Sequence, residues 1–304
     1  MTSRILITGG SGLLAVNWAL AVRNRFAVTL GLHQRGVSLA SVRTASIDLE
    51  SVDRLVAQIQ EIGPDLVIHA AALTSVEQCE SSPDLARWAN VAVAANVVQA
   101  CGRLGISVVH LSSDHLFSGQ EAMLDELAPV SPVNVYGRTK AEAEVRVLDS
   151  NPSALVIRTN FYGWGTSYRR SFSDFVIDGL RSGTGITLFK NVHYTPVLAQ
   201  TLIDAVHDLV DLKASGIFNV VGDERLSKLD FGHRVAREFG LDSNQITENS
   251  FGNQPHLVKR PLDMSLSNDK VCAVLGRRLG DVASGLGALR QQEMSGMAQE
   301  IRTL

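Results

Sequence analysis

Residues 5–15 read ILITGGSGLLA, and this stretch decides the fold class. Its apolar, partly β-branched start, Ile5–Ile7, predicts a short buried strand, and a helix is expected at 12–25. Between them, the spacing Gly9-x-x-Gly12, followed by a small residue, permits a tight turn and close packing of helix on strand. Free backbone N–H groups and the helix dipole favour an anion at such a turn. The stretch therefore predicts the pyrophosphate-binding turn of a dinucleotide-binding protein.

Strands and helices alternate at short spacing along the first half of the chain. Further strands are expected at 27–31, 65–70 and 108–111, and a further helix at 51–62. This alternation is typical of an α/β protein with a Rossmann-type, doubly wound parallel sheet. The length of 304 residues suits one large domain of this kind with a smaller lobe attached.

The composition predicts a globular protein that binds neither nucleic acid nor membrane. Hydrophobic residues make up 45% of the chain and charged residues 19%, and the net charge is −3, so no basic excess favours an anionic partner. No apolar run is long enough to span a bilayer, and the run near the N-terminus is too short for a signal peptide. Cys79, Cys101 and Cys272 are far apart, as expected for buried thiols in a reduced compartment. We therefore expect a cytoplasmic protein.

The end of the second strand bears on the choice of cofactor. It reads Gly31-Leu32-His33-Gln34-Arg35 and has no carboxylate, the group that usually binds the ribose 2′-hydroxyl of NAD. His33 and Arg35 instead suit a 2′-phosphate. The sequence therefore favours NADP(H), with NAD(H) as the alternative if Arg35 is only a solvated loop charge.

Two later segments carry candidate chemistry. Ser112-Ser113-Asp114-His115 follows the strand at 108–111, and ligands bind at such strand ends in open α/β sheets. Tyr136 and Lys140 stand four residues apart on the helix expected next, so both side chains lie on one face. The Tyr-x-x-x-Lys spacing by itself does not distinguish a catalytic pair from an ordinary helix surface.

Taken in order, these segments resemble the extended short-chain dehydrogenase/reductase family. The resemblance rests on TGGSGLLA, Asp48-Leu49, HAAALT, LSSD and Tyr136-x-x-x-Lys140. The longer stretches HAAALTSVEQCESSPDLARWANVAVAANVV, LSSDHLFSG and SPVNVYGRTKAEAE are similar to the dTDP-4-dehydrorhamnose reductases within that family. RTNFYG, Tyr194–Pro196 and RPLDMSLSNDKV extend the similarity over most of the chain.

The resemblance implies catalytic roles for Ser113, Tyr136 and Lys140. In the family the tyrosine gives a proton to the substrate carbonyl, the serine hydroxyl holds the reacting oxygen, and the lysine binds the nicotinamide ribose. A free tyrosine has a pKa of about 10, too high for efficient proton exchange near neutrality. A neighbouring ammonium group favours the phenolate, so we expect Lys140 to lower the pKa of Tyr136.

The resemblance also implies cofactor and substrate residues. The cofactor is expected to contact Gly9, Ser11, Gly12, Leu13, Leu14, His33, Arg35, Asp48, Leu49, Ala70, Ala71, Ala72, Thr74, Ser112, Tyr136 and Lys140. The substrate is expected to contact Asp114, His115, Asn160, Tyr162 and Arg260. Arg169 and Arg170 suit a diphosphate through forked hydrogen bonds, or belong to a solvated basic loop. No metal site is expected, because Ala15-Val16 stands where some relatives carry metal-binding glutamates.

The resemblance implies a Rossmann domain at 1–158 and a mainly substrate-binding lobe at 159–304, with segments that return to the sheet. The implied function is NADP(H)-dependent reduction of the keto group of a nucleotide-linked keto-deoxysugar. Nucleotide-sugar epimerases and dehydratases are the enzymatic alternatives, although His115 stands where the dehydratases have a catalytic glutamate. A non-catalytic NADP-binding subunit, similar to the regulatory subunit of methionine adenosyltransferase, is the other alternative. A homodimer is common in the superfamily and is a hypothesis here.

Overall fold

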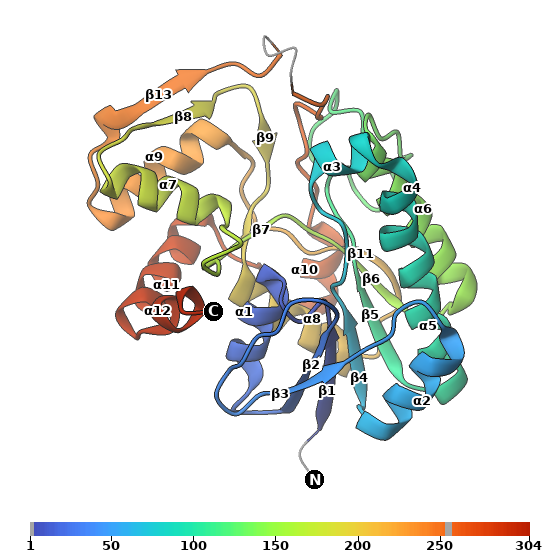
Figure 1. The fold of residues 1–304 in the computed structure, drawn as a ribbon. Helices are drawn as coiled ribbons and strands as arrows, with labels where there is room; N and C mark the ends of the chain where they lie inside the picture. The colour runs from blue at the N-terminus through green and yellow to red at the C-terminus, as the bar shows by residue number, and fades with distance from the viewer. Residues whose placement is uncertain (1–2, 253–256) are drawn as a thin grey trace.

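The computed structural model describes residues 3–252 and 257–304, and its centre is a parallel sheet of seven strands. The strands lie in the order β11-β6-β5-β4-β1-β2-β3 (Figure 1). Their bounds are β1 Arg4–Thr8, β2 Ala27–Leu32, β3 Arg43–Ser46, β4 Leu66–His69, β5 Ser107–Leu111, β6 Leu155–Arg158 and β11 Gly216–Asn219. The chain first builds outward from β1 to β3 and then crosses over to β4, which makes the sheet doubly wound. The predicted fold class is confirmed.

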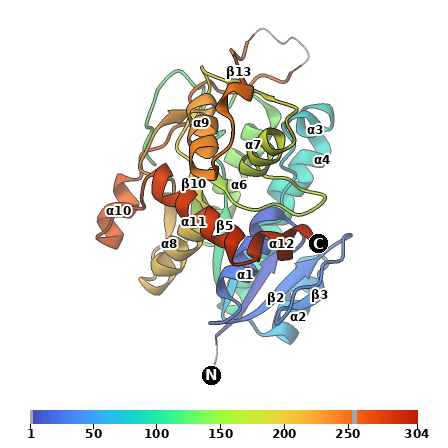
Figure 2. The same cartoon turned by 90° about the vertical axis from the view of Figure 1, so that its left-hand side faces the viewer.

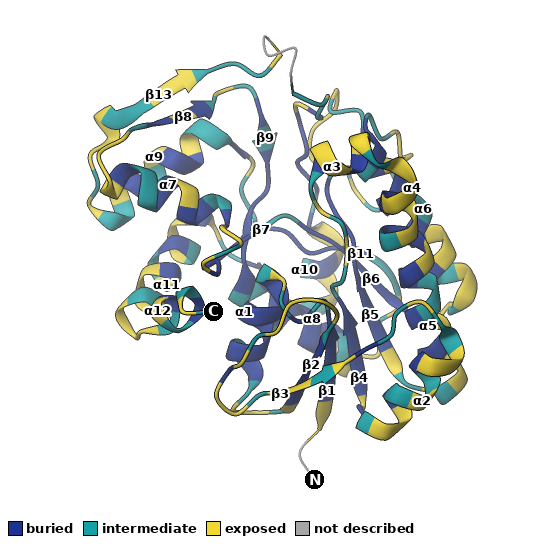
Figure 3. Ribbon diagram, in the orientation of Figure 1, coloured by how far each residue is buried: buried dark blue, intermediate teal, exposed yellow. Residues whose placement is uncertain are grey.

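Helices cover both faces of the sheet. α1 (Leu13–Val22) and α8 (Ala199–Asp211) pack on one face, and α2 (Val52–Ile62), α5 (Val93–Leu104) and α6 (Val135–Ser150) pack on the other (Figure 1). Because both faces are covered, the inner strands are almost continuously apolar and buried (Figure 3). Between β4 and α5 the chain forms α3 (Val76–Ser81), α4 (Pro83–Arg87) and the short π-helix η1 (Trp88–Ala92).

The ends of these elements follow local signals where the sequence supplies them. α2 begins as predicted, because the side chain of its N-cap Ser51 accepts a hydrogen bond from the N–H of Arg54. The helix predicted at 12–25 ends earlier, at Val22. The sequence does not predict β3, because its residues RTAS are mostly exposed at the sheet edge and have no apolar pattern.

The second half of the chain builds most of a smaller lobe, seen at the upper left of Figure 1. Its short strands and helices are β7 Phe161–Tyr162, α7 Phe172–Arg181, β8 Ile186–Phe189, β9 His193–Tyr194, β10 Val197–Leu198, β12 Leu226–Ser227, α9 Lys228–Phe239, η2 Ser243–Gln245 and β13 Ile246–Asn249. They are followed by α10 Asp269–Leu275, α11 Val282–Met294 and α12 Met297–Arg302. Two segments of this half, β11 and α8, lie with the central sheet. The boundary at residue 158 stays a prediction.

One hydrophobic core runs through both lobes. It includes Ile7 of β1 and Trp18 of α1, and it continues to Phe231 of α9 and Leu289 of α11. α12 lies against α1 near the C-terminus (Figure 2), where Arg23 and Glu300 form an ion pair of 2.5 Å. Because the two lobes share this core, the space between them has a defined shape.

Within the described ranges, no helix is long and apolar enough to cross a membrane. In the same ranges, no group of three or more His, Cys, Asp or Glu side chains is arranged to hold a metal ion. The thiols of Cys79 and Cys101 are free and buried, as the sequence predicts, whereas the free thiol of Cys272 is partly exposed.

Candidate active site

The glycine-rich turn after β1 brings the chain very close to the end of β4. Gly9 has a φ of 68°, and a Cβ atom there would lie 2.7 Å from the Cα atom of Ala71, so only glycine fits. The N–H of Gly12 donates to the carbonyl oxygen of Gly9 at 2.7 Å, and Gly12 is the N-cap of α1. Ser11 and Gly12 line the cavity described next, so the N-terminus of α1 opens on it.

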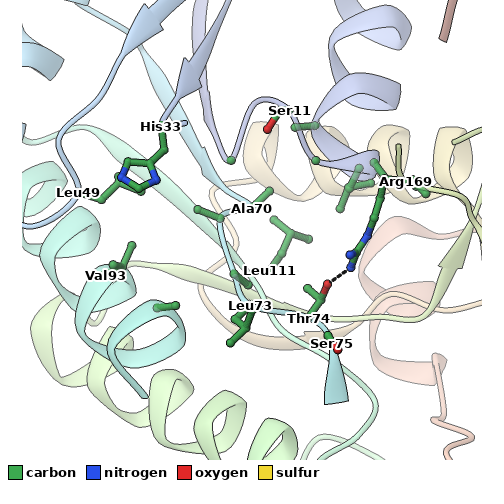
Figure 4. Close-up of a pocket in the computed structure, with 18 of the residues that line it drawn as sticks. Ser11, His33, Leu49, Ala70, Leu73, Thr74, Ser75, Val93, Leu111 and Arg169 are labelled. Atoms are coloured by element: carbon green, nitrogen blue, oxygen red, sulfur yellow. Dashed lines mark hydrogen bonds between the residues drawn. The ribbon is translucent and has the colours of Figure 1, made fainter. Parts of the chain in front are cut away.

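A cavity of about 1270 Å³ lies at the carboxyl ends of the central strands. Every residue that the sequence assigns to the cofactor, from Gly9 to Lys140, lines it. Figure 4 shows Ser11, His33, Ala70 and Leu111 around this space, together with a hydrogen bond from Arg169 to the hydroxyl of Thr74. The volume is large enough for a dinucleotide and a second small molecule.

Tyr136 stands in the first turn of α6, which Asn134 caps by accepting a hydrogen bond from the N–H of Gly137 at 2.8 Å. A Cβ atom at Gly137 would lie 2.2 Å from the carbonyl oxygen of His115, so this glycine lets the helix begin against the loop that carries Ser113. The rings of Tyr136 and His115 meet edge to face, with centroids 5.4 Å apart. Burial raises the pKa of Tyr136 to about 12, and the hydroxyl of Ser113 acts in the opposite direction. Tyr136 is therefore a protonated phenol at neutral pH.

Lys140 is buried, and its ammonium group donates a hydrogen bond to the carbonyl oxygen of Leu111 at 2.6 Å. Burial lowers the pKa of Lys140 to about 8, and the carboxylate of Glu144, one helical turn later, acts in the opposite direction. The sequence-based expectation that the pKa of Tyr136 is lowered is wrong for this structure. Burial has the largest effect on the phenol and raises its pKa, the charge of Asp114 acts in the same direction, and the hydroxyl of Ser113 and the charge of Arg169 oppose them only in part.

Two stacked histidines lie at the ends of β4 and β5, close enough for the charge of Lys140 to act on them. The rings of His69 and His110 have centroids 5.4 Å apart, and Nδ1 of His69 is 2.8 Å from the hydroxyl oxygen of Thr8. Burial, with a further contribution from Lys140, lowers the pKa of His69 to about 3 and that of His110 well below its ordinary value. Both rings are neutral at physiological pH, so the positive charge in this layer belongs to Lys140.

Three of the residues that the sequence assigns to the substrate lie together. Asp114, His115 and Asn160 all line the cavity, and the amide of Asn160 donates to the buried carboxylate of Asp114 at 2.5 Å. The hydroxyl of Ser113 lies 3.3 Å from the same carboxylate. Burial lowers the pKa of His115, so this ring is neutral at physiological pH. Through the carboxylate of Asp114, these three predicted substrate residues lie beside the predicted catalytic serine.

The structure does not bring Tyr162 and Arg260 into the cavity lining. Tyr162 belongs to β7 and is buried against the ring of Phe231, with centroids 5.1 Å apart, because β7 pairs with β10 inside the second lobe. Arg260 forms an ion pair with Glu77 of α3. Because neither side chain lines this cavity, their positions do not support the substrate contacts expected of them.

A loop of the second lobe crosses the cavity at residues 168–170. The hydroxyl of Tyr168 donates to the carbonyl oxygen of Ser11 at 2.8 Å, and the guanidinium of Arg35 stacks on the Tyr168 ring at 4.0 Å from its centroid. Arg169 and Arg170 also line the cavity, and Arg170 pairs with Asp178 of α7. The sequence does not single out Tyr168, because its partners are far away along the chain.

Asn90 is a second residue that the sequence does not single out. It lies in η1, where its side chain accepts from the N–H of Leu73 at 2.7 Å and donates to the carbonyl of Leu73 at 3.1 Å. The same amide donates to the hydroxyl of Thr139 at 3.0 Å, between Tyr136 and Lys140 on α6. Asn90 thus connects the segment after β4, which lines the cavity, to the helix that carries both candidate catalytic residues.

The comparisons with known proteins agree with this architecture. The family model described as "RmlD substrate binding domain" matches residues 3–293. The chain is 28% identical over 287 residues to the probable low-salt glycan biosynthesis reductase Agl14 of Haloferax volcanii, covering 93% of this chain and 96% of that protein. It is also 28% identical to methionine adenosyltransferase 2 subunit beta of Rattus norvegicus, over 80% of this chain and 74% of that one.

A solved structure shows the same fold. The dTDP-4-dehydrorhamnose reductase of Bacillus anthracis, in complex with NADP, superposes with a TM-score of 0.84 at 22% identity, over 96% of this chain and 100% of that one. At this level of identity the likeness shows the fold and leaves the chemistry to be argued from the residues.

Proposed function

The chain belongs to the RmlD substrate binding domain family, and from that premise we propose that it reduces the keto group of a nucleotide-linked keto-deoxysugar with NADP(H). It is an NAD(P)-dependent oxidoreductase of the dTDP-4-dehydrorhamnose reductase type. The observation that carries the proposal is that Ser113, Tyr136 and Lys140 line the same cavity as the whole dinucleotide-binding set. A homodimer and a cytoplasmic location stay predictions from the sequence.

The cavity walls suit a dinucleotide. The turn at Gly9 leaves no room for a side chain against Ala71, as close approach of backbone to a pyrophosphate requires. The N-terminus of α1 opens on the cavity and supplies free N–H groups for that anion. His33 and Arg35, at the end of β2, would hold a 2′-phosphate. NADPH, when bound, supplies the hydride for the reaction.

The chain's own residues handle the proton. Because the pKa of Tyr136 is about 12, the phenol is fully protonated at neutral pH and ready to donate. The carbonyl oxygen becomes an alkoxide during reduction, and an alkoxide is a strong enough base to take a proton from a phenol. Ser113 would donate a hydrogen bond to the same oxygen, where charge develops. Lys140 would stabilise the phenolate that Tyr136 leaves behind.

The similarity to a methionine adenosyltransferase subunit favours a second candidate, a non-catalytic NADP-binding subunit. Such a subunit needs the dinucleotide walls of the cavity but has no use for a proton donor beside them. Here Tyr136, Lys140 and Ser113 are all retained in the cavity lining, which favours the reductase. An epimerase or dehydratase would keep its cofactor through turnover, whereas a reductase releases it oxidised.

The test is oxidation of NADPH, and separately of NADH, with dTDP-4-dehydrorhamnose as substrate. We expect loss of the reduced-nicotinamide absorbance in proportion to substrate, faster with NADPH, and dTDP-rhamnose as the product. Bound cofactor without any consumption would reject dTDP-4-dehydrorhamnose as the substrate for reduction. In that case, conversion of the sugar without net oxidation would identify an epimerase, and no conversion would leave a different sugar substrate or a binding subunit.

Replacement of Arg35 tests the choice of cofactor. Arg35→Ala removes the guanidinium that we assign to the 2′-phosphate, and we expect the KM for NADPH to rise about 10- to 100-fold, as for loss of a hydrogen bond to a charged group. The KM for NADH, which lacks this phosphate, should stay near its wild-type value. Steady-state kinetics with both cofactors measure the difference.

Arg25→Ala is the matched control, because Arg25 is an exposed arginine that pairs with Asp204 and does not line the cavity. An equal rise in KM for both cofactors in Arg35→Ala would remove the 2′-phosphate argument and leave Arg35 as support for Tyr168.

A further inference from the structure

Lys228 is a cation inside the second lobe that the reaction described above does not use. It is the first residue of α9, and β12 just before it pairs with β9, so the helix begins beside Tyr194. The ammonium nitrogen lies 3.3 Å from the centroid of the Tyr194 ring and 4.4 Å from that of Phe172. Lys228 is partly buried, and its backbone N–H donates to the carbonyl oxygen of Val192. Within residues 3–252 and 257–304, its ammonium group forms no hydrogen bond or ion pair. Two aromatic faces hold the cation in place and leave its N–H donors available.

The charges that act on Lys228 are those of the candidate active site. Burial lowers the pKa of Lys228 to about 7, the carboxylate of Asp114 acts in the opposite direction, and Arg260 lowers it further. Asp114 and Arg260 also act on His115, and Asp114 acts on Tyr136. Lys228 does not itself line the cavity, but its charge acts on His115 and is acted on by Asp114, and both of these residues do line it.

Two buried polar atoms near this cation also have no partner among the described residues. They are the hydroxyl oxygen of Tyr194, on which Asp114 acts, and Nδ1 of His115. Buried polar atoms are normally hydrogen-bonded, so a cluster of unpaired ones beside an unpaired ammonium group calls for a polar ligand. An apolar side chain would pack against these two rings without the free-energy cost of desolvating a charge, so packing alone does not explain a lysine at this position.

We propose that Lys228 binds an oxygen atom of the sugar ring of the substrate, beside the carbonyl group that Tyr136 protonates. This inference rests on the proposed function. The ligand is a hydroxyl or carbonyl oxygen of the hexose, because the ring of His115, on which Lys228 acts, meets the ring of Tyr136 edge to face. Lys228 thereby fixes the sugar, and not the nucleotide, in the second lobe.

The experiment measures binding by titration calorimetry on the full chain saturated with NADP⁺. The ligands are dTDP-rhamnose, which is the alcohol that the reduction yields, and dTDP, which lacks the sugar. In Lys228→Met, which keeps the length and apolar stem of the side chain, we expect dTDP-rhamnose to bind about 10- to 100-fold more weakly. The affinity for dTDP should not change. Lys228→Arg keeps the cation and should recover part of the loss.

Lys190→Met is the matched control, because Lys190 lies in the same lobe and pairs with Glu248 at the surface. It should bind both ligands as the wild-type protein does. Unchanged affinity of Lys228→Met for dTDP-rhamnose would overturn the inference. Equal weakening for dTDP-rhamnose and dTDP would overturn it too, because it would assign the cation to the diphosphate. Failure of the wild-type protein to bind dTDP-rhamnose would instead reject the substrate class of the proposed function. If Lys228→Met does not fold, Lys228→Gln replaces it.

Discussion

Tyr136→Phe should lower kcat by about 10²- to 10⁴-fold, the usual contribution of a positioned proton donor. The substitution removes only the hydroxyl group, so the edge-to-face contact with His115 is retained and the first turn of α6 should not move. Tyr136 is fully protonated at neutral pH, and the hydroxyl of Ser113 acts on its phenol, so the two groups can serve the same substrate oxygen. Single-turnover oxidation of NADPH with saturating sugar measures this step directly.

Cofactor affinity is the internal control for Tyr136→Phe. The dinucleotide walls of the cavity are untouched, so NADPH should bind with nearly the wild-type affinity, and the midpoint of thermal unfolding should stay close to that of the parent. A variant that turns over at the wild-type rate would show that another group, or water, supplies the proton. Loss of NADPH binding together with turnover would assign Tyr136 a structural role.

Arg158→Met should lower the free energy of unfolding by about 3–5 kcal/mol, as expected when one partner of a buried ion pair is removed. The side chains of Arg158 and Glu144 are 3% and 4% exposed, and they are joined at 3.0 Å and 2.7 Å through Nε and Nη2 of the guanidinium. The pair ties the end of β6 to α6, one turn beyond Lys140. Removal of Arg158 leaves the carboxylate of Glu144 buried without its partner. Denaturant unfolding followed by circular dichroism measures the loss.

Two further variants separate the buried charge from simple loss of packing. Glu144→Leu in the Arg158→Met background removes the carboxylate that has lost its buried partner, so the double variant should be more stable than Arg158→Met alone. Arg103→Met breaks an exposed ion pair with Asp53 and should change stability little. A free energy of unfolding of Arg158→Met equal to that of Arg103→Met would mean that the buried pair contributes no more than a surface one.

α6 therefore connects stability with chemistry in this protein. Its first turn carries Tyr136, its second turn Lys140 and its third Glu144, so one helical face holds the proton donor, the cation and the anchor to the sheet. Glu144 also opposes the lowering of the pKa of Lys140 by burial. Damage to the ion pair should thus affect the ammonium group as well as the fold.

The sequence by itself determined the features that depend on near neighbours in the chain. The glycine turn at 9–12 follows a strand and starts a helix, and each of these is set by residues a few positions apart. The same holds for the four-residue spacing of Tyr136 and Lys140, because one helical turn places them on a common face. Apolar runs between helices were enough to predict a parallel sheet, since a strand buried on both faces must be apolar throughout. The cofactor residues that the family resemblance implies all line one cavity.

Only the tertiary structure decided the features that depend on contacts between distant segments. Tyr168 meets Ser11 across 157 positions of the chain, and Asn90 joins the segment after β4 to α6. Tyr162 is buried in the second lobe because β7 pairs with β10. Lys228 lies against the ring of Tyr194 because β12, which precedes it, pairs with β9. The raised pKa of Tyr136 has the same origin, since burial is produced by all the surrounding segments together. Local spacing fixes which residues share a turn or a face, whereas packing over long range fixes their solvent exposure and their partners.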